Sequence, residues 1–408
     1  MLELPDVYLF NPSCDFAIAN GSKNWQPNKT LQKMEADLAV LPMLFAKQSD
    51  FVLVDELPAS YFLETMQELG FTIPRFILKK EPGENRLFID EPKNRLLPWG
   101  WSPAAHKFLT PLKQSCSPGF QNSPVFQWCL EHRDISSRKF AFEILKEIIN
   151  STSVDWFIGN AQLPIICYAP SDIEKAIADW GTLILKAPWS SSGRGLQPIT
   201  KTPIHPKVWE KINSVISEQG FIMAEPMLNK VHDMAFLFEL KNGCTRFLGV
   251  SHFFTNNKGQ YGGNWLNGLP ENQSKELTDF IQKCIEVLTQ PLINTIDNSL
   301  MAKHYEGVFG IDTLIYRNMH NELRINPCLE INARHTMGMI SLRLEKWLGA
   351  DKKGVYKTFY QPGTSFATFK KMMEQKHPVK ISDGKFQSGF LALTPSNESA
   401  QFGAYLLV

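Results

Sequence analysis

Short apolar runs alternate with amphipathic stretches over the first 125 residues. Val7 to Phe10 and Phe51 to Asp55 have the pattern of buried strands, and Leu31 to Phe45 between them has the apolar spacing of a helix. A second helix is predicted from Ser60 to Leu69, before a third strand-like run. Because strands and helices alternate, the pattern predicts a parallel sheet with helices on its faces, a Rossmann-like unit.

The loop after the first strand is a candidate for substrate contacts, since ligands of such sheets bind beyond the carboxyl ends of the strands. Its polar candidates are Asn11, Ser13, Asp15, Asn20 and Lys23. Asparagine, aspartate and serine are also ordinary loop residues, so a plain connecting loop remains the alternative.

The segment from Leu183 to Leu196 joins an apolar strand to a turn rich in hydrogen-bond donors. The strand ends in Lys186, and Arg194 lies in a turn that also contains Ser190, Ser191, Ser192, Gly193 and Gly195. Backbone N–H groups of such a turn can close over phosphoryl oxygens, while the lysine supplies a point charge. A serine- and glycine-rich turn is also ordinary turn chemistry, so this segment alone leaves both interpretations open.

A predicted hairpin carries a second group of polar residues. Asp312 lies in its first strand, residues 318–321 form its turn, and its second strand runs to Glu330 and Asn332. Side chains alternate faces along a strand, so Glu330 and Asn332 point the same way, and Arg334 joins them if the strand continues. Two carboxylates and a carboxamide are hard oxygen ligands suited to Mg²⁺ held by nucleotide phosphates. The alternative is the solvated face of a surface hairpin.

These segments together resemble the ATP-grasp superfamily of carboxylate–amine ligases over roughly residues 130–345. The stretch from Ser136 to Ile148 is similar to the family's opening helix, whose first lysine reaches the nucleotide; Lys139 is the candidate, with Arg138 as its rival. The segment FIMAEPML, from Phe221 to Leu228, resembles the linker strand that contacts adenine and ribose.

The resemblance implies a site for ATP and Mg²⁺. The nucleotide-binding residues that it implies are Lys139, Lys186, Ser190, Ser191, Ser192, Gly193, Arg194, Gly195, Glu225 and Met227. The implied metal ligands are Asp312, Glu330 and Asn332, although the gap between the first two is long for the family and Ala333 replaces a frequent proline. The implied catalytic residues are Arg334, which binds the substrate carboxylate or acyl phosphate, and Lys186, which holds phosphate.

The expected fold class is α/β, with an α+β catalytic part: a Rossmann-like N-terminal domain followed by an ATP-grasp domain pair. We expect the N-terminal domain over residues 1–125, a lid subdomain with the phosphate-covering loop over 126–220, and a C-terminal subdomain with the metal site and a β extension over 221–408. The implied activity is ATP-dependent ligation of a carboxylate to an amine, a C–N bond formed through an acyl phosphate. A kinase acting on a small hydroxylated substrate and a catalytically silent ATP-binding module are the alternatives.

The composition of the chain limits the kinds of partner that we expect it to bind. The formal charge of +1 offers no general attraction to nucleic acid or to an anionic membrane. Seven cysteines without a CxxC pair are typical of reduced thiols, and the N-terminus lacks the basic start of a signal peptide, so we expect a cytoplasmic protein. The expected partners are small-molecule carboxylate and amine substrates. The sequence leaves the oligomeric state open, a homodimer included.

Overall fold

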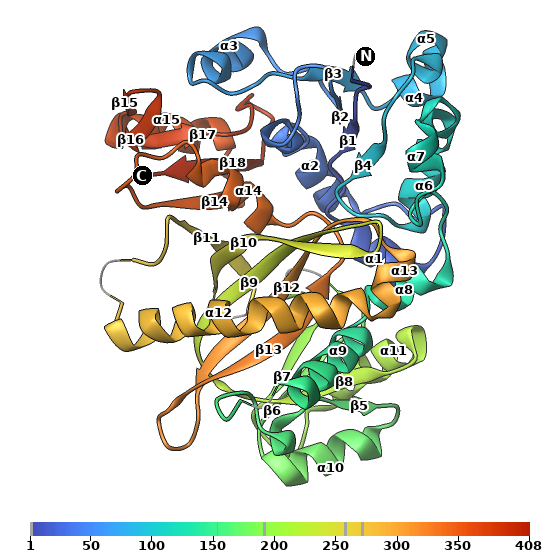
Figure 1. The fold of residues 1–408 in the computed structure, drawn as a ribbon, viewed down its shortest axis with the longest axis vertical. Coiled ribbons are helices and arrows are strands. Elements are labelled where there is room, and N and C mark those ends of the chain that lie inside the picture. Colours follow the sequence, from blue (N-terminus) through green and yellow to red (C-terminus); the bar gives the residue numbers. More distant parts are fainter. Residues whose placement is uncertain (1–2, 153, 191–192, 257–258, 271–272) are drawn as a thin grey trace. The chain divides into compact units, whose positions relative to one another are not determined.

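The computed structural model describes residues 3–152, 154–190, 193–256, 259–270 and 273–408. The chain forms two compact units (Figure 1). The first unit comprises Met1–Trp128, Gly262–Glu271 and Arg334–Val408, and the second comprises Cys129–Tyr261 and Asn272–Ala333. The predicted division into residues 1–125, 126–220 and 221–408 stays a prediction.

A four-stranded parallel sheet forms the N-terminal part of the first unit. Its strands follow the order β3 (Arg75–Leu78), β2 (Phe51–Val54), β1 (Val7–Leu9) and β4 (Leu96–Pro98). All three neighbouring pairs are parallel, and β1 and β2 are buried along their whole length. The helices α2 (Lys29–Asp37) and α3 (Ser60–Glu68) alternate with these strands. The predicted Rossmann-like unit is therefore confirmed.

The helix predicted from Leu31 to Phe45 is shorter than expected. The Asn28 side chain caps α2 by accepting a hydrogen bond from the Leu31 backbone N–H at 3.0 Å, and α2 ends at Asp37. A separate 3₁₀ turn, η1 (Leu41–Leu44), follows. Pro42 lies at the start of that turn. Because proline has no N–H group and its ring clashes with the preceding turn, a continuous α-helix through this position is unfavourable.

The C-terminal part of the first unit contains antiparallel strands. They follow the order β11 (Tyr261–Leu266), β14 (Gly354–Tyr360), β18 (Phe402–Leu407) and β17 (Phe390–Ala392). The last two strands, β17 and β18, pair in antiparallel fashion. One hydrophobic cluster joins the two parts of the unit: it runs from Tyr8 and Val52 in the parallel sheet to Tyr356 and Leu406 in the antiparallel strands.

The second unit contains two antiparallel groups of strands. The larger group follows the order β13 (Leu323–Asn332), β12 (Gly307–Arg317), β9 (Asn229–Lys241) and β10 (Cys244–Thr255). The smaller group follows the order β5 (Ile165–Cys167), β8 (Ile222–Pro226), β6 (Leu183–Lys186) and β7 (Leu196–Ile199). Each group supplies residues of the candidate site.

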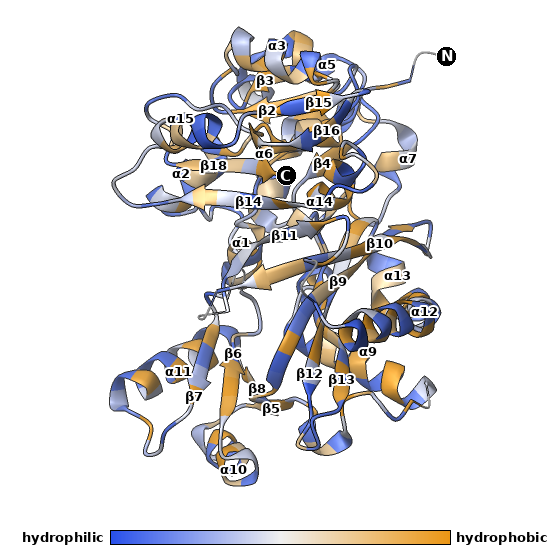
Figure 2. Ribbon diagram, turned by 90° about the vertical axis from the view of Figure 1, so that its left-hand side faces the viewer, coloured by the Kyte–Doolittle hydropathy of each residue, from blue (hydrophilic) through white to orange (hydrophobic). Residues whose placement is uncertain are grey.

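Helices cover both groups of strands in the second unit. The helices α9 (Arg138–Ser151) and α12 (Lys275–Asp297) pack on the larger group, and α10 (Pro170–Trp180) and α11 (Pro206–Gln219) pack on the smaller group. The buried residues of α12 recur every three to four positions, from Leu277 to Ile296, so one face of the helix is apolar. Figure 2 shows this alternation of polar and apolar residues around α12.

Short elements complete the fold. They are α1 (Cys14–Asn20), α4 (Glu81–Glu84), α5 (Arg86–Asp90), α6 (Pro103–Leu109), η2 (Thr110–Ser115), α7 (Pro118–Gln121), α8 (Leu130–Ile135), η3 (Asn160–Gln162), α13 (Leu300–His304), α14 (Met337–Glu345), α15 (Phe366–Lys376), β15 (Lys380–Ser382) and β16 (Lys385–Ser388). None of the helices in the described ranges combines the length and the hydropathy that crossing a bilayer requires.

The packing of α15 on β18 generates a prediction about stability. A Cβ atom at Gly403 would lie 2.2 Å from the ring of Phe366, which is fully buried and cannot swing into solvent. We therefore expect Gly403→Ala to lower the free energy of unfolding by about 2 kcal/mol, the typical cost of overpacking a core. Urea denaturation measures this change.

Gly83→Ala is the matched control, because a Cβ atom there would meet no other atom within 4 Å. Its effect should stay within about 0.5 kcal/mol, as for most surface substitutions. Equal stability of the two variants would show that the contact between α15 and β18 is looser than described.

Candidate functional site

A buried ion pair links two strands of the smaller group in the second unit. The Nζ atom of Lys186, at the end of β6, lies 2.5 Å from the Oε2 atom of Glu225 on β8. The two side chains are only 7% and 10% exposed. The antiparallel pairing of β6 with β8, which places Ile184 opposite Glu225, brings the two charges to the same region. Both residues were predicted to bind nucleotide, and the structure places them in contact.

Arg138, another buried cation of this unit, also forms an ion pair. It is the first residue of α9, where the Ser137 hydroxyl caps the helix by accepting a bond from the Phe140 N–H at 3.1 Å. The Arg138 Nη2 atom lies 2.9 Å from the Glu330 Oε1 atom, and its Nε atom donates to the Ala187 carbonyl at 3.1 Å. A weaker contact of 3.5 Å reaches the Ser190 hydroxyl.

Arg138 is buried, whereas its neighbour Lys139 is exposed. Successive residues point about 100° apart around a helix axis, so only one of two adjacent cations can face the strands. The structure places Arg138, the rival candidate, among the predicted site residues, and it places Lys139 on the exposed side of α9.

The three predicted metal ligands converge on the hairpin of β12 and β13. Asp312 lies directly opposite Glu330, so their side chains share a face, and Asn332 follows two residues later on the same face. The Asn332 Nδ2 atom donates to the Asp312 Oδ2 atom at 3.2 Å. The long gap in sequence is taken up by the length of the two strands, so it does not separate the ligands in space.

Close packing restricts the turn after β6. Ser190 is buried, and a Cβ atom on Gly195 would lie 2.3 Å from its hydroxyl oxygen. Gly193 has φ of +73°, and a Cβ atom there would lie 2.5 Å from the Gly259 carbonyl oxygen, so glycine is required at this position. Arg194 lies between these two glycines and is exposed. The predicted residues Ser191 and Ser192 lie outside the described residues.

The linker predicted to contact adenine contains β8 and the residues after it. Met227 is 42% exposed, and its backbone N–H donates to the Thr182 carbonyl at 3.3 Å. Glu225 precedes it and faces Lys186, as described above.

Arg334 does not continue the strand that carries Glu330 and Asn332, because β13 ends at Asn332. The condition for Arg334 to share their face is therefore not met. Arg334 belongs to the first unit, where its Nε and Nη2 atoms lie 3.0 and 2.9 Å from the Asp15 Oδ2 atom. Its Nη1 atom donates to the His335 carbonyl at 3.1 Å. Asp15 belongs to the loop region that was predicted to contact substrate.

Glu35 carries a buried carboxyl group that sequence reasoning missed. Its Oε1 atom accepts a hydrogen bond from the Ser13 hydroxyl at 2.6 Å and another from the Ser13 N–H at 3.2 Å. Burial raises the pKa of the Glu35 carboxyl, and the bonds from Ser13 oppose that shift. The sequence did contain a signal for this residue: Glu35 is an acidic residue at a position of α2 that faces the core. Of the other loop candidates, Asn11 bonds the Gly100 carbonyl at 2.8 Å, while Asn20 and Lys23 are exposed.

His335 lies beside this group in the first unit. Its ring lies 5.4 Å from that of Phe45 and 5.6 Å from that of Trp99, measured between ring centroids. Burial lowers the pKa of His335 to about 4, so its imidazole is neutral at pH 7.

No protein-family model matches the sequence, and no curated protein matches it. Solved structures do match. The ADP complex of purK, an N5-carboxyaminoimidazole ribonucleotide synthetase, has a TM-score of 0.50 at 10% identity, covering 100% of this chain and 94% of its own. The biotin carboxylase domain of Hydrogenobacter thermophilus 2-oxoglutarate carboxylase, in complex with MgADP, ADP and bicarbonate, also has a TM-score of 0.50 at 10% identity, covering 100% of this chain and 86% of its own.

Both structures belong to ATP-grasp enzymes. At this identity the similarity concerns the fold alone. It confirms the predicted fold class, an α/β protein that begins with a Rossmann-like sheet and has the overall fold of these two structures.

The buried pair of Lys186 and Glu225 generates a prediction. Glu225→Gln leaves the Lys186 charge buried without a counter-charge, so we expect the free energy of unfolding to fall by about 3 kcal/mol. Urea denaturation without nucleotide measures the change.

The matched control is Glu239→Gln, since Glu239 pairs with Arg246 at 2.6 Å but on the surface. Its loss should cost less than about 1 kcal/mol. A Glu225→Gln variant as stable as this control would contradict a tightly coupled buried pair.

Proposed function

We propose that the chain is an ATP-dependent carboxylate–amine ligase of the ATP-grasp type that works through an acyl phosphate. One observation carries the proposal: two buried cations, Arg138 and Lys186, lie in direct contact with the carboxylates Glu330 and Glu225 in the second unit. Paired groups of this kind, held in a fold shared with nucleotide-bound ATP-grasp enzymes, support a site for a polyphosphate and its metal.

The phosphate-binding part of the proposal rests on Lys186, Arg138 and the turn after β6. Lys186 supplies a compact charge, and the planar guanidinium of Arg138 suits two phosphoryl oxygens at once. The turn from Ser190 to Gly195 would cover the terminal phosphate with its backbone N–H groups. We assign Lys139 a lesser role, as a cation at the exposed start of α9.

The metal-binding part rests on the oxygen ligands of the β12–β13 hairpin. Asp312, Glu330 and Asn332 share one face and offer the hard oxygen atoms that Mg²⁺ prefers. Bound there, Mg²⁺ would neutralise the charge of the phosphate oxygens during phosphoryl transfer. Glu330 then has two roles, because it also pairs with Arg138.

The substrate-binding part rests on Arg334 in the first unit. Asp15 holds its guanidinium group through two nitrogen atoms, which fixes the plane of the group. We propose that Arg334 binds the carboxylate that becomes phosphorylated and stabilises the acyl phosphate while an amine attacks it. An oriented guanidinium suits this planar, bidentate task. In this reaction ATP gives ADP, the acid oxygen takes the γ-phosphoryl group, and the amine displaces phosphate.

The products of turnover test this proposal. A panel of carboxylic acids and amines is incubated with the protein, ATP and Mg²⁺, and ADP, phosphate and organic products are measured. The proposal requires ADP and phosphate that depend on both an acid and an amine. A phosphorylated alcohol would instead identify a kinase, and the absence of ADP with every substrate would identify a silent module.

Glu330→Gln tests the metal ligands within the same assay. Removal of one charged ligand leaves the phosphate charge under-neutralised, so we expect kcat to fall by roughly 10²- to 10³-fold while the fold survives. The control is Glu322→Gln, in the exposed turn of the same hairpin, where Glu322 pairs with Arg324. The control should keep full activity. Activity of Glu330→Gln equal to that of the control would refute the metal assignment.

A further inference from the structure

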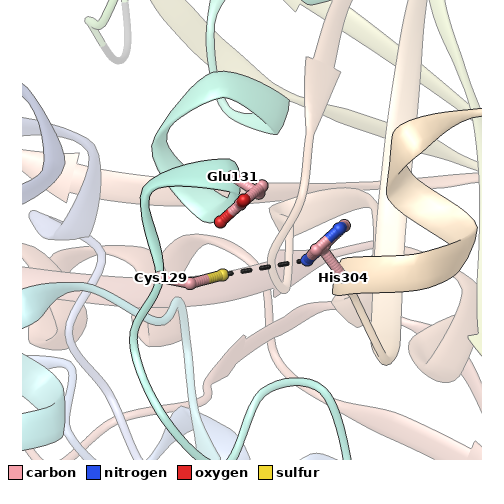
Figure 3. A group of neighbouring side chains, drawn as sticks. All are labelled: Cys129, Glu131 and His304. Atoms are coloured by element: carbon pink, nitrogen blue, oxygen red, sulfur yellow. Dashed lines mark hydrogen bonds between the residues drawn. The ribbon is translucent and has the colours of Figure 1, made fainter.

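Three side chains with metal-binding chemistry converge at a place that the proposed reaction does not use. Single ligand atoms of Cys129, Glu131 and His304 all lie within 4.8 Å of one another. The Cys129 Sγ atom lies 3.9 Å from the His304 Nδ1 atom (Figure 3). Cys129 and Glu131 are at the start of α8, and His304 is the last residue of α13. All three belong to the second unit, and each is partly exposed.

A buried histidine holds the two segments together. The Cys129 backbone N–H donates to the His132 Nδ1 atom at 3.2 Å, so the proton of the neutral ring is on Nε2. That Nε2 atom donates to the His304 carbonyl at 2.7 Å. His132 therefore links the main chain of Cys129 to that of His304. These two hydrogen bonds hold the backbones of Cys129 and His304 close together, and with them the two side chains.

The spacing of the ligand atoms is close to that of a tetrahedral zinc site. Bond lengths of about 2.3 Å to sulfur and about 2.0 Å to nitrogen place these two atoms roughly 3.5 Å apart at a tetrahedral angle. The observed separation is 3.9 Å, so a small movement of one side chain brings both into coordination distance. A carboxylate oxygen from Glu131 supplies a third ligand of the kind that zinc accepts.

The chemistry of these ligands also selects the metal. Thiolate and imidazole favour Zn²⁺ and related transition metals, whereas Mg²⁺ and Ca²⁺ favour oxygen ligands alone. This group is therefore distinct from the all-oxygen group of Asp312, Glu330 and Asn332 in both position in the chain and preferred metal.

We propose that Cys129, Glu131 and His304 form a Zn²⁺ site with solvent as the fourth ligand. Bound zinc joins the start of α8 to the end of α13. Only two residues separate α8 from α9, whose first residue Arg138 holds Glu330. The metal thus braces the segment that leads into the candidate site.

Zinc uptake by the intact, metal-stripped protein tests this proposal. Competition against a chromophoric zinc chelator, without nucleotide and with excess Mg²⁺, should give one Zn²⁺ per chain and a higher melting temperature. Co²⁺ in place of zinc should give the near-ultraviolet absorption of a thiolate–Co²⁺ bond. Cys129→Ser should abolish that absorption and weaken zinc binding by at least about 100-fold, since loss of even an outer-shell partner costs about 10- to 100-fold.

Two further ligand variants keep the test decisive if Cys129→Ser folds poorly. His304→Gln and Glu131→Gln should also weaken zinc binding, and His304→Gln should leave the sulfur absorption weaker but present. The matched controls are Cys244→Ser and His320→Gln, which change exposed residues of the same types in the second unit. Both controls should bind zinc as the wild type does. Absence of zinc binding by the wild type, or unchanged binding by folded ligand variants, would overturn the proposal.

Discussion

The second unit depends on the balance of charge between two buried cations and the carboxylates that face them. Lys186 and Arg138 are both withdrawn from water, and each is compensated by one glutamate, Glu225 for the lysine and Glu330 for the arginine. Burial of a charge is costly unless a partner and hydrogen bonds replace its water. In this fold, strand pairing fixes the position of each partner: β6 pairs with the strand that carries Glu225, and β12 pairs with the strand that carries Glu330. The same arrangement leaves the cations dehydrated and oriented, which is what a site for phosphate requires.

This balance explains how an anion and a metal could bind together. An entering polyphosphate would compete with Glu225 and Glu330 for the two cations, and a metal bound to Glu330, Asp312 and Asn332 would compensate the carboxylate that Arg138 releases. Each ligand compensates a charge that the other would leave without a partner if it bound alone. Their binding should therefore be cooperative. The first unit contains a parallel case, since Asp15 compensates Arg334 and orients it.

The sequence predicted most where the signal was local. Strand alternation placed Glu330 and Asn332 on one face, and the pairing of β12 with β13 bears this out; Lys186 was also predicted at the end of its strand. Other features depended on packing. Arg138 and Lys139 are adjacent cations, and only the packing of α9 on β13 decides which one is buried. Asp15 and Arg334 are 319 residues apart, so no local pattern could pair them. The sequence left open whether the strand continues to Arg334, and in the structure β13 ends at Asn332.

The central claim is that the buried pairs of the second unit form a site for ATP with its metal. Isothermal titration of the protein with ATP, with and without Mg²⁺, tests it most directly when the titration is repeated with Arg138→Met and Lys139→Met. We expect Mg²⁺-dependent binding that Arg138→Met weakens by at least about 10-fold, the loss of one charge-assisted contact of roughly 1.4 kcal/mol or more. Lys139→Met should bind nearly as the wild type does. Binding that is absent, indifferent to Mg²⁺, or dependent on Lys139 rather than Arg138 would contradict it.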